Sequence, residues 1–134
     1  MNHEKAQANL QLVLDWIDAL RRRDIDTIAE RFHTNVTWTD LTGGVACKGR
    51  EEVLAWLRTA PAQPPDVDAL ELLADDDHVV LGVRNHARQE LAGVHLEGQL
   101  FTVFTLRDGQ IAHLRDHPHR DDALAQAGLD FHWH

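Results

Sequence analysis

Four strand-like segments follow one another in the second half of the chain, and this succession limits the possible folds more than any other feature. They span residues 67–75, 78–90, 94–106 and 110–118 and are separated by turn residues. Between the last two, Arg107–Gly109 reads as a short hairpin turn in which the glycine supplies a positive φ. Strands joined by short turns pair antiparallel, so this half predicts an antiparallel meander.

The first half is predicted to be helical, with one strand inserted. Residues 6–22 carry apolar side chains at helical spacing, and a second, short helix follows with Asp24 or Asp26 as its cap. The segment 35–41 alternates like a strand, and 48–60 reads as a third helix. We therefore expect an α+β fold in which a curved sheet wraps the long helix, leaving a cone whose wide mouth is a pocket.

Composition limits the class of protein. The 134 residues fit a single domain, 1–134, and a net charge of −9 argues against nucleic acid and anionic membranes as partners. Cys47 is the only cysteine, which excludes an intrachain disulfide and a cysteine-based zinc site. No signal peptide or apolar run of membrane-spanning length is present, so a cytoplasmic protein is expected.

Three stretches carry a resemblance to a known family: VLDWIDALRRRDIDTIAERFHTNVTWTD, KGREEVLAWL and GQLFTVFTLRDGQIAHLRDH. Together they resemble the SnoaL-like group of the nuclear transport factor 2-like superfamily, from about residue 10 to about residue 128. The resemblance implies a cone-shaped, cystatin-like fold and a homodimer. The superfamily includes ketosteroid isomerases, limonene epoxide hydrolases, polyketide cyclases and non-catalytic binding proteins, so the fold alone does not choose a function.

The resemblance to ketosteroid isomerases is incomplete. Asp40 stands where those enzymes carry a general base, but Trp16 replaces their helical tyrosine and Phe101 replaces their late acidic residue. Each missing oxyanion donor would cost about 3 kcal/mol of transition-state stabilisation. Steroid isomerisation by that mechanism is therefore not expected.

The resemblance to limonene epoxide hydrolases is closer in the second half. Arg84 and Asp116 match two members of their catalytic group, while His86 replaces a carboxylate. A neutral imidazole can activate water and an imidazolium can donate a proton, so epoxide opening would be altered rather than excluded. In SnoaL-type cyclases an acidic residue near the end of the last strand is the acid or base, which here is Asp116, with Asp121 and Asp122 in the turn beyond.

Two alternatives stay open for each candidate carboxylate. Alternation puts Ala112, Leu114 and Asp116 on one face of the last strand, and Ile111, His113, Arg115 and His117 on the other. Asp116 then points into the cone as an acid or base with a raised pKa, or forms a structural ion pair with Arg84. Asp40 is a pocket base or caps the turn at 42–44.

The other candidates concern the pocket. Alternation places Val80, Gly82, Arg84 and His86 on one face of a strand, with the small glycine leaving room for ligand contacts by Arg84 and His86. Candidate pocket-lining residues are Trp16, Trp38, Phe101, Val80 and Leu114. Plain core packing is the alternative for the aromatic residues, and it is the better interpretation of Trp56.

The stretch HLRDHPHRDD, residues 113–122, raises the question of a metal site. His117 and His119 have a chelating spacing, but Pro118 disrupts the strand and Arg115 puts a cation beside His117. A closed site needs three or four ordered ligands. We therefore predict exposed histidines at a strand end and no metal.

The leading hypothesis is a cofactor-independent enzyme that acts on a small apolar molecule containing a carbonyl or an epoxide. Asp40 or Asp116 would exchange a proton with the substrate, while Arg84 and His86 orient or polarise an oxygen. The alternatives are a dimeric, non-catalytic protein that binds a hydrophobic ligand, and an epoxide hydrolase with an altered catalytic set.

Overall fold

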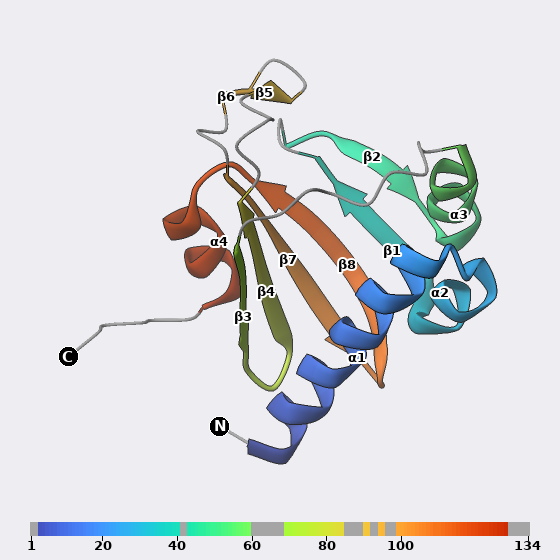
Figure 1. Ribbon diagram of the computed structural model, residues 1–134, viewed down its shortest axis with the longest axis horizontal. Helices are drawn as coiled ribbons and strands as arrows, with labels where there is room; N and C mark the ends of the chain where they lie inside the picture. Colours follow the sequence, from blue (N-terminus) through green and yellow to red (C-terminus); the bar gives the residue numbers. More distant parts are fainter. Residues whose placement is uncertain are drawn as a thin grey trace.

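A curled sheet with helices on both faces forms the body of the protein in a computed structural model (Figure 1). The structure describes residues 3–40, 43–59, 69–84, 90–91, 94–95 and 99–128. The helices are α1 (His3–Arg22), α2 (Ile25–Arg31), α3 (Arg50–Thr59) and α4 (Arg120–Ala127). The strands are β1 (Phe32–Thr39), β2 (Val45–Lys48), β3 (Ala69–Ala74), β4 (His78–Arg84), β5 (Glu90–Leu91), β6 (Val94–His95), β7 (Gln99–Arg107) and β8 (Gln110–His117). The α+β prediction is confirmed.

The six long strands pair in the order β2-β1-β8-β7-β4-β3. Every neighbouring pair is antiparallel except β1 and β8, which are parallel. Of the predicted strand 78–90 the described residues form β4 and the start of β5, and of the predicted strand 94–106 they form β6 and most of β7. β5 and β6 pair as a separate two-stranded ribbon.

The two faces of the sheet carry separate apolar clusters. On the inner face, α1 contributes residues buried at helical spacing, including Val13, Trp16 and Ala19, which pack with Phe104 of β7 and Leu114 of β8. On the outer face, α4 covers a smaller cluster in the middle of the sheet. Figure 1 shows α1 crossing in front of the sheet and α4 at the other side of it.

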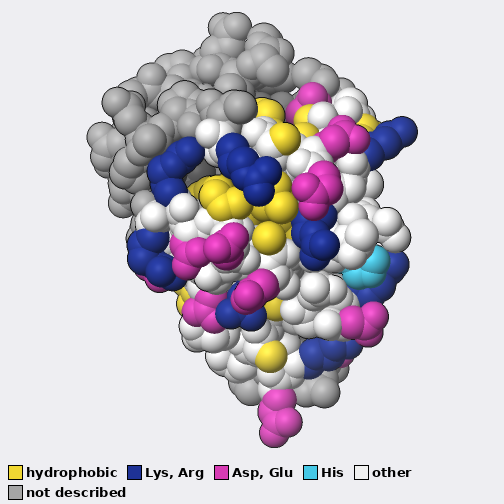
Figure 2. All heavy atoms as spheres, turned by 90° about the vertical axis from the view of Figure 1, so that its right-hand side faces the viewer, with side chains coloured by type: hydrophobic (Ala, Val, Ile, Leu, Met, Phe, Trp, Pro, Cys, Tyr) yellow, Lys and Arg dark blue, Asp and Glu magenta, His cyan; other side chains and the backbone are white. Residues whose placement is uncertain are grey.

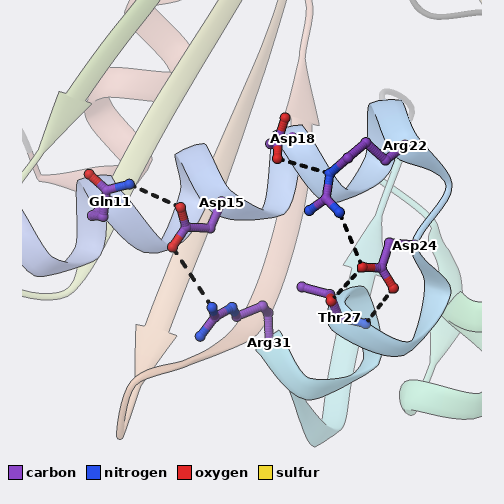
Figure 3. A network of polar contacts seen from close by, with 7 residues as sticks. All are labelled: Gln11, Asp15, Asp18, Arg22, Asp24, Thr27 and Arg31. Atoms are coloured by element: carbon purple, nitrogen blue, oxygen red, sulfur yellow. Dashed lines mark hydrogen bonds and ion pairs between the residues drawn. The ribbon is translucent and has the colours of Figure 1, made fainter.

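Polar contacts fix the corner between α1 and α2 (Figure 3). Arg22 of α1 contacts Asp18 at 3.0 Å and Asp24 at 3.4 Å. Asp24 caps α2 by accepting hydrogen bonds from the backbone N–H and the hydroxyl of Thr27. These hydrogen bonds lower the pKa of Asp24. The cap begins α2 and so determines where β1 enters the sheet.

One extra residue on β8 sets the register of the β7–β8 hairpin. Leu106 pairs with Ile111 but Thr105 pairs with His113, so Ala112 is a bulge. The bulge corrects the predicted alternation, because Ile111 joins Leu114 in the inner core rather than facing outward. The residues beyond Ala112 then alternate as predicted.

None of the helices in the described ranges is long and apolar enough to cross a membrane.

Candidate active site

The carboxyl group of Asp116 is held on the inner face by donors from both neighbouring strands. The indole N–H of Trp38 on β1 donates to Oδ2 at 3.0 Å, and the hydroxyl of Thr102 on β7 donates to Oδ1 at 2.8 Å. Thr102 is the cross-strand partner of Asp116 in the register that follows the bulge. Three adjacent strands therefore orient one acidic group.

Burial raises the pKa of Asp116, and this effect exceeds the opposing ones. The hydrogen bonds from Thr102 and Trp38 and the charge of His117 all lower the pKa, while the charge of Asp40 raises it further. Desolvation thus favours the neutral form of the carboxyl, while the two hydrogen-bond donors favour its anion. An acid balanced in this way can both accept and return a proton.

Asp40 follows β1 directly and caps the turn that joins β1 to β2. Its Oδ1 accepts a hydrogen bond from the N–H of Gly44 at 3.3 Å, and its backbone carbonyl accepts one from Gly43, whose φ is +86°. The capping alternative for Asp40 is therefore observed. Asp40 also lies close enough to Asp116 for its charge to act on that carboxyl.

Two tryptophans meet beside Asp116. The rings of Trp38 and of Trp56 on α3 pack edge to face, with their centroids 4.8 Å apart. Trp56 was predicted to be core, but half of its surface is exposed. On the side of the molecule that carries α2, α3 and β2, apolar side chains gather in a hollow bordered by charged groups (Figure 2).

Trp16 and Leu114 lie on the same face of the sheet but are fully packed in the core. The ring of Trp16 contacts Phe104 and Phe32 edge to face, at centroid distances of 5.3 and 6.2 Å. Its buried indole N–H has no hydrogen-bond partner among the described residues. Trp16 and Leu114 thus belong to the core cluster of the inner face, against which Trp38 also packs.

Phe101 and Val80 are not brought together with Asp116, because they lie on the outer face. Both pack in the cluster beneath α4 with Val103. Gly82 leaves no room for a ligand: a Cβ there would lie 2.7 Å from the ring of Phe101. Glycine is needed at this position because the Phe101 ring lies against the backbone of Gly82.

The remaining two predicted site residues are less fully described. The backbone of Arg84 ends β4 and pairs with Gln99 of β7, and His86 lies outside the described residues. Val80 and Gly82 belong to the face that α4 covers. The alternation that grouped Arg84 with them therefore gives no reason to place it beside Asp116.

The histidine-rich stretch divides between a strand and a helix. The His113 ring lies 2.6 Å from the Thr37 hydroxyl, His117 hydrogen-bonds Gln126 of α4, and His119 is the N-cap residue of α4. Asp121 and Asp122 occupy the first turn of that helix. Within the ranges described, no three His, Cys, Asp or Glu side chains are grouped closely enough to hold a metal ion.

Comparison with known proteins identifies the family. The SnoaL-like domain family matches residues 13–114. The chain belongs to this family. No curated protein matches it.

Solved structures with the same fold come from several bacteria and from soil DNA. Bal32a, from a soil-derived mobile gene cassette, is 25% identical, with a TM-score of 0.63 over 84% of this chain and 90% of that chain. A candidate polyketide cyclase of Xanthomonas campestris is 18% identical, with a TM-score of 0.66 over 91% and 98%. An LEH-like epoxide hydrolase of Mycobacterium tuberculosis is 17% identical, with a TM-score of 0.64 over 84% and 83%. These likenesses establish the nuclear transport factor 2-like fold, and the chemistry has to be argued from the site.

Sequence reasoning missed Thr102 as a site residue. The only available signal was its position on the strand before the hairpin turn, and that signal is misleading without the bulge. Counting straight back from Asp108–Gly109 places Phe101, not Thr102, opposite Asp116.

Proposed function

We propose that the protein is a cofactor-independent SnoaL-like enzyme in which Asp116 exchanges a proton with a small apolar molecule containing a carbonyl or an epoxide. The observation that carries the proposal is the partly buried Asp116 carboxyl, held by Trp38 and Thr102. A carboxyl with a raised pKa is a stronger base than an ordinary aspartate and remains protonated to higher pH.

For a carbonyl substrate, the anion of Asp116 removes a proton from the carbon next to the carbonyl and forms an enolate. If the enolate is conjugated with a C=C bond, returning the proton to the far carbon of that bond isomerises the molecule. If the substrate contains a second carbonyl, attack of the enolate carbon on it closes a ring, and the proton goes to the new alkoxide. The two donors keep the carboxylate in one orientation during either step. In this proposal Asp40 is the second carboxylate. The family resemblance alone gives Arg84 and His86 the role of orienting the substrate oxygen, and no contact among the described residues supports it.

The same contacts favour a second candidate function, a non-catalytic protein that binds a hydrophobic ligand. Both oxygens of Asp116 already have hydrogen-bond donors, and Asp40 caps its turn, so each carboxylate has a structural role. In that case Asp116 would fix the ends of β1, β7 and β8 and would move no proton. An experiment has to separate catalysis from this role.

The test measures turnover and binding on the same panel of ketones and epoxides. Proton exchange of ketones in D₂O is followed by NMR, and diol formation from epoxides by chromatography. Asp116→Asn keeps the shape of the side chain, and Asp121→Asn is the matched control because Asp121 is an exposed residue of α4. We expect Asp116→Asn to lower turnover by about 100-fold or more, the contribution of a general acid or base, and the control to leave it unchanged.

Two results would contradict the catalytic proposal. Turnover that survives in folded Asp116→Asn would show that another group moves the proton. Ligands that quench tryptophan fluorescence without any turnover would favour the binding function. Diol formation alone would select the epoxide alternative, in which case His86→Asp should raise it.

A further inference from the structure

The outer face of the sheet has two halves of different character. Over β4 and β7 it is apolar and α4 covers it. Over β2, β1 and β8 the register places polar side chains side by side, with one exposed valine. This half consists of Thr37, Thr39, Val45, Lys48, His113 and Arg115, and we call it the polar half-face.

Arg115 is the unusual member of the polar half-face. Its side chain is partly buried, and its Nε is buried without a hydrogen-bond partner among the described residues. Its Nη2 lies 3.9 Å from the point that a Cβ on Gly43 would occupy, so the guanidinium extends toward the turn after β1. A buried donor of a charged group that has no acceptor is destabilising, so it favours the approach of an acceptor. The Nε of Arg115 is therefore a donor for which the described part of the protein supplies no acceptor.

Four other cations in the described ranges differ from Arg115 because each is paired with a carboxylate. Lys5, Arg22, Arg31 and Arg120 each contact a carboxylate within 4.0 Å. Such pairs are easily formed in a chain with 22 acidic and 13 basic residues. Arg115 makes no such contact within the described ranges.

The neighbours of Arg115 on the polar half-face are also donors. The hydroxyl of Thr37 lies 2.6 Å from Nδ1 of His113, which fixes the ring two residues from Arg115. Burial and the charge of Arg115 lower the pKa of His113, so at neutral pH the ring is uncharged. In the tautomer in which the Thr37 hydroxyl donates to Nδ1, the ring proton is on Nε2 and is available to an acceptor. Lys48 is the cross-strand partner of Thr37, two strands and therefore roughly 10 Å from His113.

We propose that Arg115, with His113 beside it and Lys48 as a more distant cation, forms a binding site for a small oxyanion such as a phosphate or carboxylate group. A guanidinium binds such groups through two parallel hydrogen bonds. The net charge of −9 opposes anion binding only over distance, and salt screens it beyond about 8 Å. The site lies on the opposite face of the sheet from Asp116, so it does not depend on the proposed enzymatic function.

The test titrates the full chain with inorganic phosphate, followed by calorimetry and by backbone NMR. Arg115→Gln is the test variant. Arg107→Gln is the matched control, because it removes the same charge from an exposed position at the end of β7. We expect saturable binding that Arg115→Gln weakens by about tenfold or more, since a charge-assisted pair is lost. Arg107→Gln should leave it within about twofold, the effect of a screened distant charge.

Arg115→Lys keeps the charge and loses the planar guanidinium, so it should bind phosphate with intermediate affinity. If Arg115→Gln does not fold, the lysine variant still tests the proposal. Absence of saturable binding to the wild type, or equal weakening by Arg115→Gln and Arg107→Gln, would overturn the proposal. A dimer detected by sedimentation would also overturn the proposal if Arg115→Gln dissociates it and phosphate does not affect it. The acceptor for Arg115 would then be a carboxylate of a second copy of the chain.

Discussion

Replacing Thr102 with valine should raise the pKa of Asp116 further while leaving the shape of the strand nearly unchanged. The variant removes the hydroxyl that donates to Oδ1 at 2.8 Å and keeps a β-branched side chain on β7. A hydrogen bond to a charged group contributes about 1.5–3 kcal/mol. One pKa unit corresponds to about 1.36 kcal/mol, so the pKa should rise by about one to two units.

The same change has a predictable effect on stability as a function of pH. Because burial raises the folded-state pKa of Asp116, its contribution to stability is greatest below the unfolded pKa and falls as pH rises through the folded pKa. The Thr102 hydroxyl stabilises the anion, so Thr102→Val should destabilise the protein most above the folded pKa of the variant. The difference from wild type should shrink as pH falls through the two folded pKa values.

The assay is an NMR titration of carboxyl carbons in protein labelled at aspartate, with Asp116→Asn to assign the resonance. Thr105→Val is the control, because Thr105 faces the other side of β7, opposite His113. A pKa in Thr102→Val within about 0.3 unit of the wild-type value would refute the reasoning, since less than about 0.4 kcal/mol would then separate the two proteins. Urea unfolding at several pH values gives the stability difference.

Three further substitutions test the packing. Gly82→Ala should lower the free energy of unfolding by about 1–3 kcal/mol because its Cβ would displace the Phe101 ring. Urea denaturation would measure this loss, and an unchanged free energy of unfolding would mean that the ring moves freely. Arg120→Gln removes the paired contacts to Glu71, the shortest 2.8 Å. Because both side chains are partly exposed, the loss should be about 0.5–1 kcal/mol, and faster hydrogen exchange confined to α4 would report it. Asp24→Ala should lower the thermal midpoint by removing the cap of α2, and a midpoint equal to that of the wild type would argue against this cap.

The helices and the fold class could be predicted because their signals are local. Val13 and Trp16 recur at the spacing of one helix face, and Gly128 ends α4 in the left-handed conformation with φ +69°. The position of Asp116 near the end of the last strand was also readable from the sequence. Of the two hydrogen-bond donors to Asp116, Trp38 was expected near the site and Thr102 was not.

The misplaced residues share one physical cause, which is that alternation shows which residues share a face but not which face it is. Val80 shares a face with Gly82 by the period of two, and Phe101 is the cross-strand partner of Gly82. Only α4 reveals that this face is the outer one. Nothing in the sequence shows where α4 packs. A tertiary contact thus decided between the two sides of the sheet.

The bulge at Ala112 gives β8 one residue more than its partner strand needs. A relative that is one residue shorter between 111 and 113 could pair its two strands regularly and still place an acid opposite the residue that matches Thr102. The counterpart of Asp116 in such a protein is therefore found from its cross-strand partner, not by counting from the hairpin turn. An alignment gap at this point would be neutral for the site, whereas an inserted residue in β7 would not.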